Sequence, residues 1–489
     1  MSTIKKQGIQ NALITYLGVA IGFVSLMFIQ PNLLKAEDLG LTRILIASAS
    51  LLATILPLGV SSVTTRFFPY FRNEEKNHHG YFGFMMLFPL VGTIVCGILV
   101  YSFKGLLIRQ YIDQSPLFTH YFDFVLPLAT IMGVNMALNA YSSSLFKTTI
   151  ITFLEGILSR VVFIVLIVIF YYEWISLVQF IDFFILSYLL QTIWMCVYLF
   201  VIDKPTLKID KDHLKSVGVS KLIGFGLLLT LTNVSSLSLK HLDAVLIGKY
   251  MDLTYVAVFS VSAYISLMIE IPLNSLERIS HSKIAQAFAN NDLESIKKIY
   301  YQSVKYLMLI GGLLLVGILC NVHELFRLLP YEYHTGMNVT FISCCAAFLN
   351  VSTGVNTAII FNSSKYLFGT FLLVVLMVFA LLLNVWLIPK YGVAGAALAT
   401  GMLAVLYNIT KFLLILIFFK MQPYDLNSVK IIVVIAFSFL VAYLLPHFDN
   451  LFVAMTIKTI VISGVYLGLT YFLKIVPEFH KYIPFNKEK

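Results

Sequence analysis

Between Tyr366 and Pro389 the chain reads YLFGTFLLVVLMVFALLLNVWLIP, a run without a charged side chain. About 20 apolar residues in a helix cross the hydrocarbon core of a bilayer, so this run predicts a transmembrane helix. Uncharged blocks of similar length recur at 44–65, 80–103 and 124–146. With 59% hydrophobic and only 12% charged residues among 489, the chain is too apolar for a water-soluble domain and is predicted to be an integral membrane protein.

The fold class predicted is an all-α polytopic membrane protein with about 14 transmembrane helices, divided by charge clusters and by Gly, Pro or Asn. The first span follows Lys5 and Lys6 but is too long for a secretory signal, so we keep it as a helix. The predicted spans are 11–30, 44–65, 81–103, 121–146, 150–171, 176–202, 219–248, 253–275, 303–321, 337–360, 366–388, 392–419, 429–446 and 452–473.

Positive charge is distributed unevenly between the two sides of this topology. With the N-terminus inside, 23 of the 34 Lys and Arg residues fall inside and 7 outside, which predicts that both termini are cytoplasmic. The predicted cytoplasmic loops include 66–80, 203–221 and 277–305. This asymmetry explains the net charge of +10, so we expect no nucleic-acid partner.

A weak internal repeat suggests how the helices are grouped. Residues 35–39 precede a span that ends at Pro57-Leu58, and residues 249–253 precede one that ends at Pro272-Leu273. Six helices separate the copies, so both enter the membrane in the same direction, as in transporters with parallel repeats; chance similarity of two apolar hairpins is the alternative. We expect a six-helix lobe at 1–202, a cytoplasmic linker at 203–221, a second six-helix lobe at 222–420, and two extra helices with a tail at 421–489.

Several short motifs carry a resemblance to a known family. AEDLGL at 36–41, PLGVSS at 57–62 and RFFP at 66–69 come first, then IAQAFANNDLE at 284–294 and PKYGVAGAALA at 389–399. In this order and spacing the chain resembles the Wzx-type polysaccharide-biosynthesis flippases of the MOP superfamily, relatives of the MATE exporters and of the lipid II flippase.

The resemblance implies two lobes around a central cavity that opens alternately to each side of the bacterial inner (cytoplasmic) membrane. The implied cargo is an undecaprenyl-pyrophosphate-linked oligosaccharide, such as an O-antigen, capsule or exopolysaccharide repeat unit. The implied partners are this lipid-linked oligosaccharide, membrane lipids and the polysaccharide polymerase or assembly machinery.

Arg160 lies about ten residues into the fifth predicted span, or ~15 Å at 1.5 Å per residue, near the middle of the membrane. Glu155 is five positions earlier and about 140° around the helix, a poor position for pairing. Two interpretations stay open: Arg160 pairs with another helix for structure, or its guanidinium lines the cavity and binds the carrier pyrophosphate.

Other ionisable residues in or beside spans are candidates for binding or coupling. Lys240 and Asp243 share a helix face and can pair, or Lys240 can attract the anionic head group while His241 or Asp243 responds to a coupling ion. The full set of candidate substrate-binding cations is Arg160, Lys240, His241, Arg43, Arg66 and Lys411. The candidate ion-coupling residues are Asp243, Glu270 and Glu155, with interfacial or structural roles as their alternatives; Lys458 is expected to snorkel outward.

An exporter and a membrane enzyme are the two alternative functions. A MATE-like drug or metabolite exporter would need an acidic residue in the first lobe for cation exchange, yet residues 11–30 contain no Asp or Glu. A membrane enzyme would need a catalytic cluster in a long external loop, and no HExxH, GxSxG or P-loop motif is present. We therefore expect no enzyme activity, no metal site and no cofactor, with coupling to Na⁺ or H⁺ left open.

The predicted orientation can be tested by cysteine labelling in a variant that lacks the native cysteines. Because 203–221 is predicted to face the cytoplasm and the loop near 450 the outside, a membrane-impermeant thiol reagent added to intact cells should label Asn450→Cys and leave Ser216→Cys unlabelled. Permeabilised cells are the control, in which both positions should react. Labelling of Ser216→Cys alone in intact cells would show that the true topology is the inverse of the predicted one.

Overall fold

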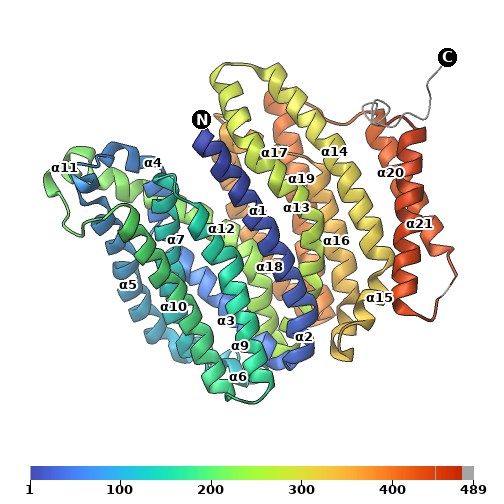
Figure 1. The fold of residues 1–489 in the computed structure, drawn as a ribbon, viewed down its shortest axis with the longest axis horizontal. Helices are drawn as coiled ribbons and strands as arrows, with labels where there is room; N and C mark the ends of the chain where they lie inside the picture. The colour runs from blue at the N-terminus through green and yellow to red at the C-terminus, as the bar shows by residue number, and fades with distance from the viewer. Residues whose placement is uncertain (1, 447, 476–489) are drawn as a thin grey trace. The chain divides into compact units, whose positions relative to one another are not determined.

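The computed structural model describes residues 2–446 and 448–475, and the residues it describes form helices joined by short loops, with no strand. Figure 1 shows these helices as long rods. Within this part of the chain, 14 helices are long and apolar enough to cross a membrane, which confirms the predicted fold class. They are Gln10–Leu33, Ala36–Ile55, Asn77–Arg109, Phe122–Ser144, Thr149–Tyr171, Leu177–Ile202, Val219–Tyr250, Leu253–Ala289, Leu293–Cys320, Tyr331–Ser352, Tyr366–Tyr391, Val393–Phe419, Leu426–Tyr443 and Leu451–Phe472.

The second span differs from its prediction at 44–65. Helix α3 (Ala36–Ile55) ends before Pro57, and a separate helix α4 (Val60–Phe71) follows. Leu58 and Gly59 break the helix because they adopt left-handed φ angles of 47° and 73°. Glycine is required at 59, where a Cβ atom would lie 2.1 Å from the carbonyl oxygen of Gly226.

The prediction of a loop at 277–305 is also wrong, because most of these residues are helical. Helix α13 (Leu253–Ala289) continues through Pro272, and α14 (Leu293–Cys320) begins only a few residues after it ends. No glycine follows Pro272 within α13, so nothing there favours the left-handed break seen after Pro57. Asp292 caps α14 by accepting a hydrogen bond from the backbone N–H of Ser295 at 2.9 Å.

The first and fifth spans each contain a π-helical turn. In the first, η1 (Ser25–Ile29) separates α1 (Ser2–Val24) from α2 (Gln30–Leu33). In the fifth, η4 (Leu154–Leu158) separates α8 (Thr149–Phe153) from α9 (Ser159–Tyr171). The two spans touch closely, since a Cβ atom on Gly18 would lie 2.6 Å from the carbonyl oxygen of Gly156. Such π-helical turns often mark functional sites.

The chain divides into two compact units, each with its own apolar core. Unit 1 comprises 1–260 and 384–392, and unit 2 comprises 261–383 and 393–489. The segment 203–221 lies within unit 1, so these packing units divide the chain differently from the predicted six-helix lobes. In unit 2, α20 (Leu426–Tyr443) and α21 (Leu451–Phe472) pack on each other and on α14 (Figure 1).

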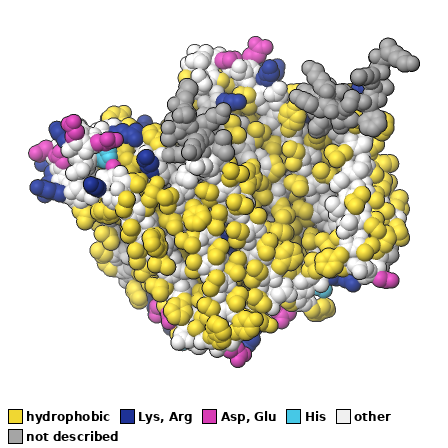
Figure 2. Space-filling view, viewed as in Figure 1, with side chains coloured by type: hydrophobic (Ala, Val, Ile, Leu, Met, Phe, Trp, Pro, Cys, Tyr) yellow, Lys and Arg dark blue, Asp and Glu magenta, His cyan; other side chains and the backbone are white. Residues whose placement is uncertain are grey.

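The outer surface of the helices is apolar. Along α5 (Tyr81–Arg109), Leu90, Ile94 and Ile98 are 55%, 64% and 64% exposed, a spacing of four residues that forms one outward stripe. Figure 2 shows apolar side chains over the sides of the helices and most charged side chains near their ends. Such a surface suits contact with lipid tails rather than with water.

Candidate functional site

Arg160 lies at the start of α9, directly after the π-helical turn η4. Its Nη1 atom is buried and has no hydrogen-bond partner among the residues that the structure describes. A buried donor without an acceptor costs about 1–3 kcal/mol, and more when the group is charged. This atom is therefore suited to donate a hydrogen bond to an anionic ligand.

The carboxylate of Glu155, in η4, is held by an amide rather than by a cation. Asn139 of α7 (Val125–Ser144) donates hydrogen bonds from its Nδ2 atom to both carboxylate oxygens, at 2.9 and 2.8 Å. Among the described residues no ion pair joins Glu155 to Arg160. An amide thus holds the acid of the fifth span. The Nη1 atom of Arg160 has no partner among the described residues.

Arg43 belongs to a polar chain inside unit 1. Its Nη2 atom donates to the Oε1 atom of Gln30, and Gln30 donates from Nε2 to the Oγ atom of Ser25 at 2.9 Å. Gln30 is only 4% exposed. The chain links α3 to the π-helical turn of the first span, so Arg43 packs between helices and does not extend to the membrane surface.

The remaining unit 1 candidates lie on or against α12 (Val219–Tyr250). The exposed Arg66 guanidinium stacks on the ring of Phe225, 4.4 Å from its centroid. Lys240 is exposed and His241 is half-buried. The carboxylate of Asp243 is buried and accepts a hydrogen bond at 2.8 Å from Asn384 of α18 (Tyr366–Tyr391).

Two candidates, Glu270 and Lys411, lie in unit 2. Lys411, 2% exposed on α19 (Val393–Phe419), donates from Nζ to the Oγ1 atom of Thr357 at 3.2 Å and lies 3.9 Å from the ring centroid of Tyr407. Glu270 accepts a hydrogen bond at 2.9 Å from Asn350. All other candidates belong to unit 1, so each unit contains its own cationic and acidic groups.

Sequence reasoning missed Glu277, which faces the same unit 2 cluster. It lies within electrostatic range of Lys411 and against the hydroxyl of Thr357. The predicted eighth span ends at 275, which places residue 277 in the following loop. The signal that could have found it is the seven-residue spacing from Glu270, which puts both carboxylates on one face of a continued helix.

The position of Lys458 in α21 is a further correction. It was expected to snorkel outward, but its Nζ atom forms an ion pair at 2.6 Å with the Oε1 atom of Glu324, which is 4% exposed. It also donates to the carbonyl oxygen of Cys320 at 3.2 Å. A buried acid close in space outweighs the advantage of reaching the membrane surface, because a buried carboxylate without a counter-ion is costly.

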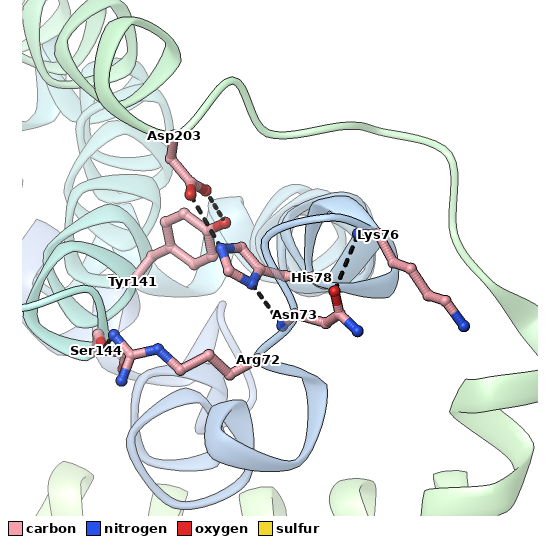
Figure 3. A network of polar contacts seen from close by, with 7 residues as sticks. All are labelled: Arg72, Asn73, Lys76, His78, Tyr141, Ser144 and Asp203. Carbon is pink, nitrogen blue, oxygen red and sulfur yellow. Dashed lines mark hydrogen bonds and ion pairs between the residues drawn. The ribbon is translucent and has the colours of Figure 1, made fainter.

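A polar network at the ends of three spans joins distant parts of unit 1, and no sequence motif predicted it (Figure 3). The Nε2 atom of His78 lies 3.0 Å from the Oδ1 atom of Asp203, whose Oδ2 atom accepts a hydrogen bond at 2.5 Å from the hydroxyl of Tyr141. The backbone N–H of Asn73 donates to Nδ1 of His78 at 3.0 Å. Both ring nitrogens are therefore satisfied when His78 is neutral with its proton on Nε2.

The backbone at this network is strained. Asn77, His78 and His79 have left-handed φ angles of 45°, 51° and 51°, a conformation that costs roughly 1–2 kcal/mol per non-glycine residue. Gly80 continues the run at 70°, and a Cβ atom there would lie 2.0 Å from the carbonyl oxygen of Lys208. The network thus holds the 72–80 loop tightly against the segment that follows α10 (Leu177–Ile202).

Two aspartates carry the charge of this region. Burial by itself raises the pKa of Asp203, but the hydrogen bonds from His78 and Tyr141, together with the nearby charge of Arg72, outweigh burial and lower that pKa below its usual value. The hydrogen bond from His79, at 2.8 Å, is the largest cause that lowers the pKa of Asp210. Both carboxylates are therefore ionised near neutral pH and act as fixed acceptors.

The chain was compared with known families and structures. The family model described as "Polysaccharide biosynthesis protein" matches residues 32–329. No curated protein matches the sequence.

Three solved structures illustrate the shared fold. The lipid II flippase MurJ, in an inward closed conformation, is 16% identical with a TM-score of 0.74 over 97% of this chain and 99% of that one. An inward-facing multidrug resistance MATE transporter is 16% identical with a TM-score of 0.61, over 84% and 96% of the two chains. A MOP superfamily transporter from Pyrococcus furiosus is 16% identical with a TM-score of 0.54, over 84% and 94%. The chain therefore shares its fold with these three transporters.

The lowered pKa of Asp203 predicts a pH-dependent contribution to stability. The contribution is fully present above the ordinary carboxyl pKa of 3.8 and is lost as pH falls through the lower folded value. At pH 7, Asp203→Asn should reduce the free energy of unfolding by about 1–3 kcal/mol, the cost of a lost charged hydrogen bond. Thermal unfolding of the purified protein, followed from pH 7 down to about 3, would measure this difference.

The exposed Asp113 supplies a control, since Asp113→Asn should leave the unfolding temperature unchanged across the same range. If the destabilisation by Asp203→Asn did not shrink at low pH, the charge of the Asp203 carboxylate would not be what stabilises the network.

Proposed function

The chain belongs to the family of polysaccharide biosynthesis proteins, and from this premise we propose that it is a flippase for an undecaprenyl-pyrophosphate-linked oligosaccharide. The cargo would be the repeat unit of an O-antigen, capsule or exopolysaccharide. It would move from the inner to the outer leaflet of the bacterial cytoplasmic membrane by alternating access. The head group of such a lipid is too polar to cross hydrocarbon unaided, so a carrier is needed.

The observation that carries the proposal is the buried, unpartnered Nη1 atom of Arg160 inside the fifth span. A planar guanidinium binds phosphate oxygens in a bidentate manner, so Arg160 would hold the pyrophosphate of the carrier. Arg43, Arg66 and Lys240 would add positive charge in unit 1, whereas Lys411 in unit 2 faces Glu270 and Glu277. These roles suit an anionic cargo.

A MATE-like exporter of drugs or metabolites is the second candidate, favoured by the fold shared with MATE transporters. Cation-coupled export of a cationic drug needs an acidic binding site. The first span, Gln10–Leu33, contains no Asp or Glu, and Asn139 holds Glu155 of the fifth span through both oxygens. These features favour the flippase.

Several finer expectations belong to this proposal. The chain would act in the inner membrane as a multi-pass protein with both termini in the cytoplasm. It would work as a carrier with no enzyme activity and no cofactor, alongside a polysaccharide polymerase. Asp243, Glu270 and Glu155 are the buried or half-buried acids that could respond to a coupling ion.

The role of Arg160 can be tested by substitution. A charged hydrogen bond contributes about 1.5–3 kcal/mol, so Arg160→Ala should reduce transport by roughly 10- to 100-fold at normal abundance in the membrane. Arg160→Lys should restore only part, because a point charge replaces the bidentate fork. The exposed Arg109 is the matched control, and Arg109→Ala should transport normally. Full transport by Arg160→Ala would give Arg160 a structural role instead.

The cargo can be tested by deletion of the protein. Since the carrier is proposed to move the completed lipid-linked oligosaccharide outward, its loss should trap this lipid on the inner leaflet and remove the matching surface polysaccharide. Radiolabelled lipid extracts and surface glycan staining would measure both effects. Intact surface glycans together with raised retention of cationic dyes in the deletion strain would refute the flippase proposal and favour an exporter.

A further inference from the structure

A cluster of ionisable side chains lies inside unit 2 and has no assigned role. Glu270, Glu277 and His281 are spaced by seven and four residues on α13, which places them on one face of this helix. Lys411 and Tyr407 face them from α19, Thr357 from α17 (Asn356–Asn362), and Asn350 from α16 (Met337–Ser352). We call these seven residues the unit 2 cluster.

Lys411 is the cation of this cluster. Its side chain is 2% exposed, its Nζ atom donates to Thr357 at 3.2 Å, and both Glu270 and Glu277 lie within electrostatic range. A buried ammonium is tolerated only when acids compensate its charge. Lys411 therefore balances one of the two carboxylates, and the second is left over.

His281 does not balance the second carboxylate. The Nδ2 atom of Asn362, which can only donate, lies 2.8 Å from Nδ1 of His281 and also donates to the carbonyl oxygen of Ala358 at 2.7 Å. Nδ1 of His281 therefore accepts a hydrogen bond and has no proton, so the imidazole is neutral. Tyr407, the remaining titratable group of the cluster, is neutral in its ordinary phenol form and likewise adds no positive charge.

With both glutamates ionised, the cluster would bury one net negative charge in a membrane-spanning region, which is strongly unfavourable. One bound proton removes this excess and leaves an ion pair and a neutral acid. Asn350 donates to Glu270 at 2.9 Å, while Glu277 lies against a hydroxyl that can accept as well as donate. A proton on Glu277 therefore has an acceptor, and the pair of acids as a whole holds one proton.

We propose that Glu270 and Glu277 share one exchangeable proton beside Lys411, so that unit 2 contains a proton-binding site. This deepens the proposed function by naming the coupling ion, and it rests on that function only for its part in transport. Release of the proton leaves a net negative charge inside unit 2 that water must solvate. Protonation thus favours a dry cluster and deprotonation a hydrated one, the kind of two-state preference that coupling requires.

The proton count can be measured without any transport assay. The carboxylic-acid C=O stretch in infrared difference spectra of the purified protein in lipid nanodiscs at neutral pH reports protonated glutamates. Subtracting the spectrum of each variant from that of the wild type isolates the cluster. Glu277→Gln and Glu270→Gln should each lose one acid band, because the remaining glutamate and Lys411 then balance.

Removal of the cation should have the opposite effect. In Lys411→Met both acids must be protonated, so the acid band should gain one equivalent over the wild type. The double variant Lys411→Met with Glu277→Gln should return to the wild-type intensity. The exposed Glu74 supplies the control, and Glu74→Gln should change nothing at neutral pH. Each variant is compared only if it elutes as a single species in size exclusion.

Two results would overturn the proposal. One is an unchanged acid band in both glutamate variants, and the other is an unchanged band in Lys411→Met. Because these spectra do not depend on cargo, they test the proton site separately from the flippase function. Either proposal can be refuted while the other stands.

Discussion

Hydrocarbon offers no hydrogen bonds, so an ionisable side chain inside a membrane span must find its partner on another helix. Much of the polar structure described here follows from this constraint. Asn139 holds Glu155, Asn384 holds Asp243, Asn350 holds Glu270, and Lys458 pairs with Glu324. Amides serve three of these four acids. An amide satisfies a carboxylate without adding a second charge, whereas an ion pair requires the desolvation of two charged groups.

The same constraint makes the exceptions informative. Arg160 has a buried nitrogen without an acceptor, next to a π-helical turn and to the close glycine contact between the first and fifth spans. The unit 2 cluster has one acid more than its lysine can balance. Arg160 thus lacks an anion, and the unit 2 cluster lacks a cation. Such complementary needs suit a carrier of an anionic cargo that is driven by a cation.

Helix irregularities position these groups. The left-handed break at Leu58 and Gly59 ends α3 early, whereas the uninterrupted α13 brings Glu277 and His281 onto the face of Glu270. At the start of the third span, the run of left-handed residues from Asn77 to Gly80 costs backbone energy, and the contacts among His78, Asp203 and Tyr141 compensate for it. The structure therefore concentrates strain where distant segments of the chain must be held together.

The sequence by itself determined the membrane class, the number of spans and the family resemblance, because hydrophobic length is a local property that needs no knowledge of packing. It also identified Arg160, Asp243, Glu270 and Lys411, since a charge within an apolar run is visible in one dimension. Only the tertiary structure decided the partners, because they come from helices far apart in the chain: Lys458 meets Glu324 and Asp243 meets Asn384. The prediction also ended the eighth span before Glu277, which lies within a continued helix and faces a buried lysine over a hundred residues away.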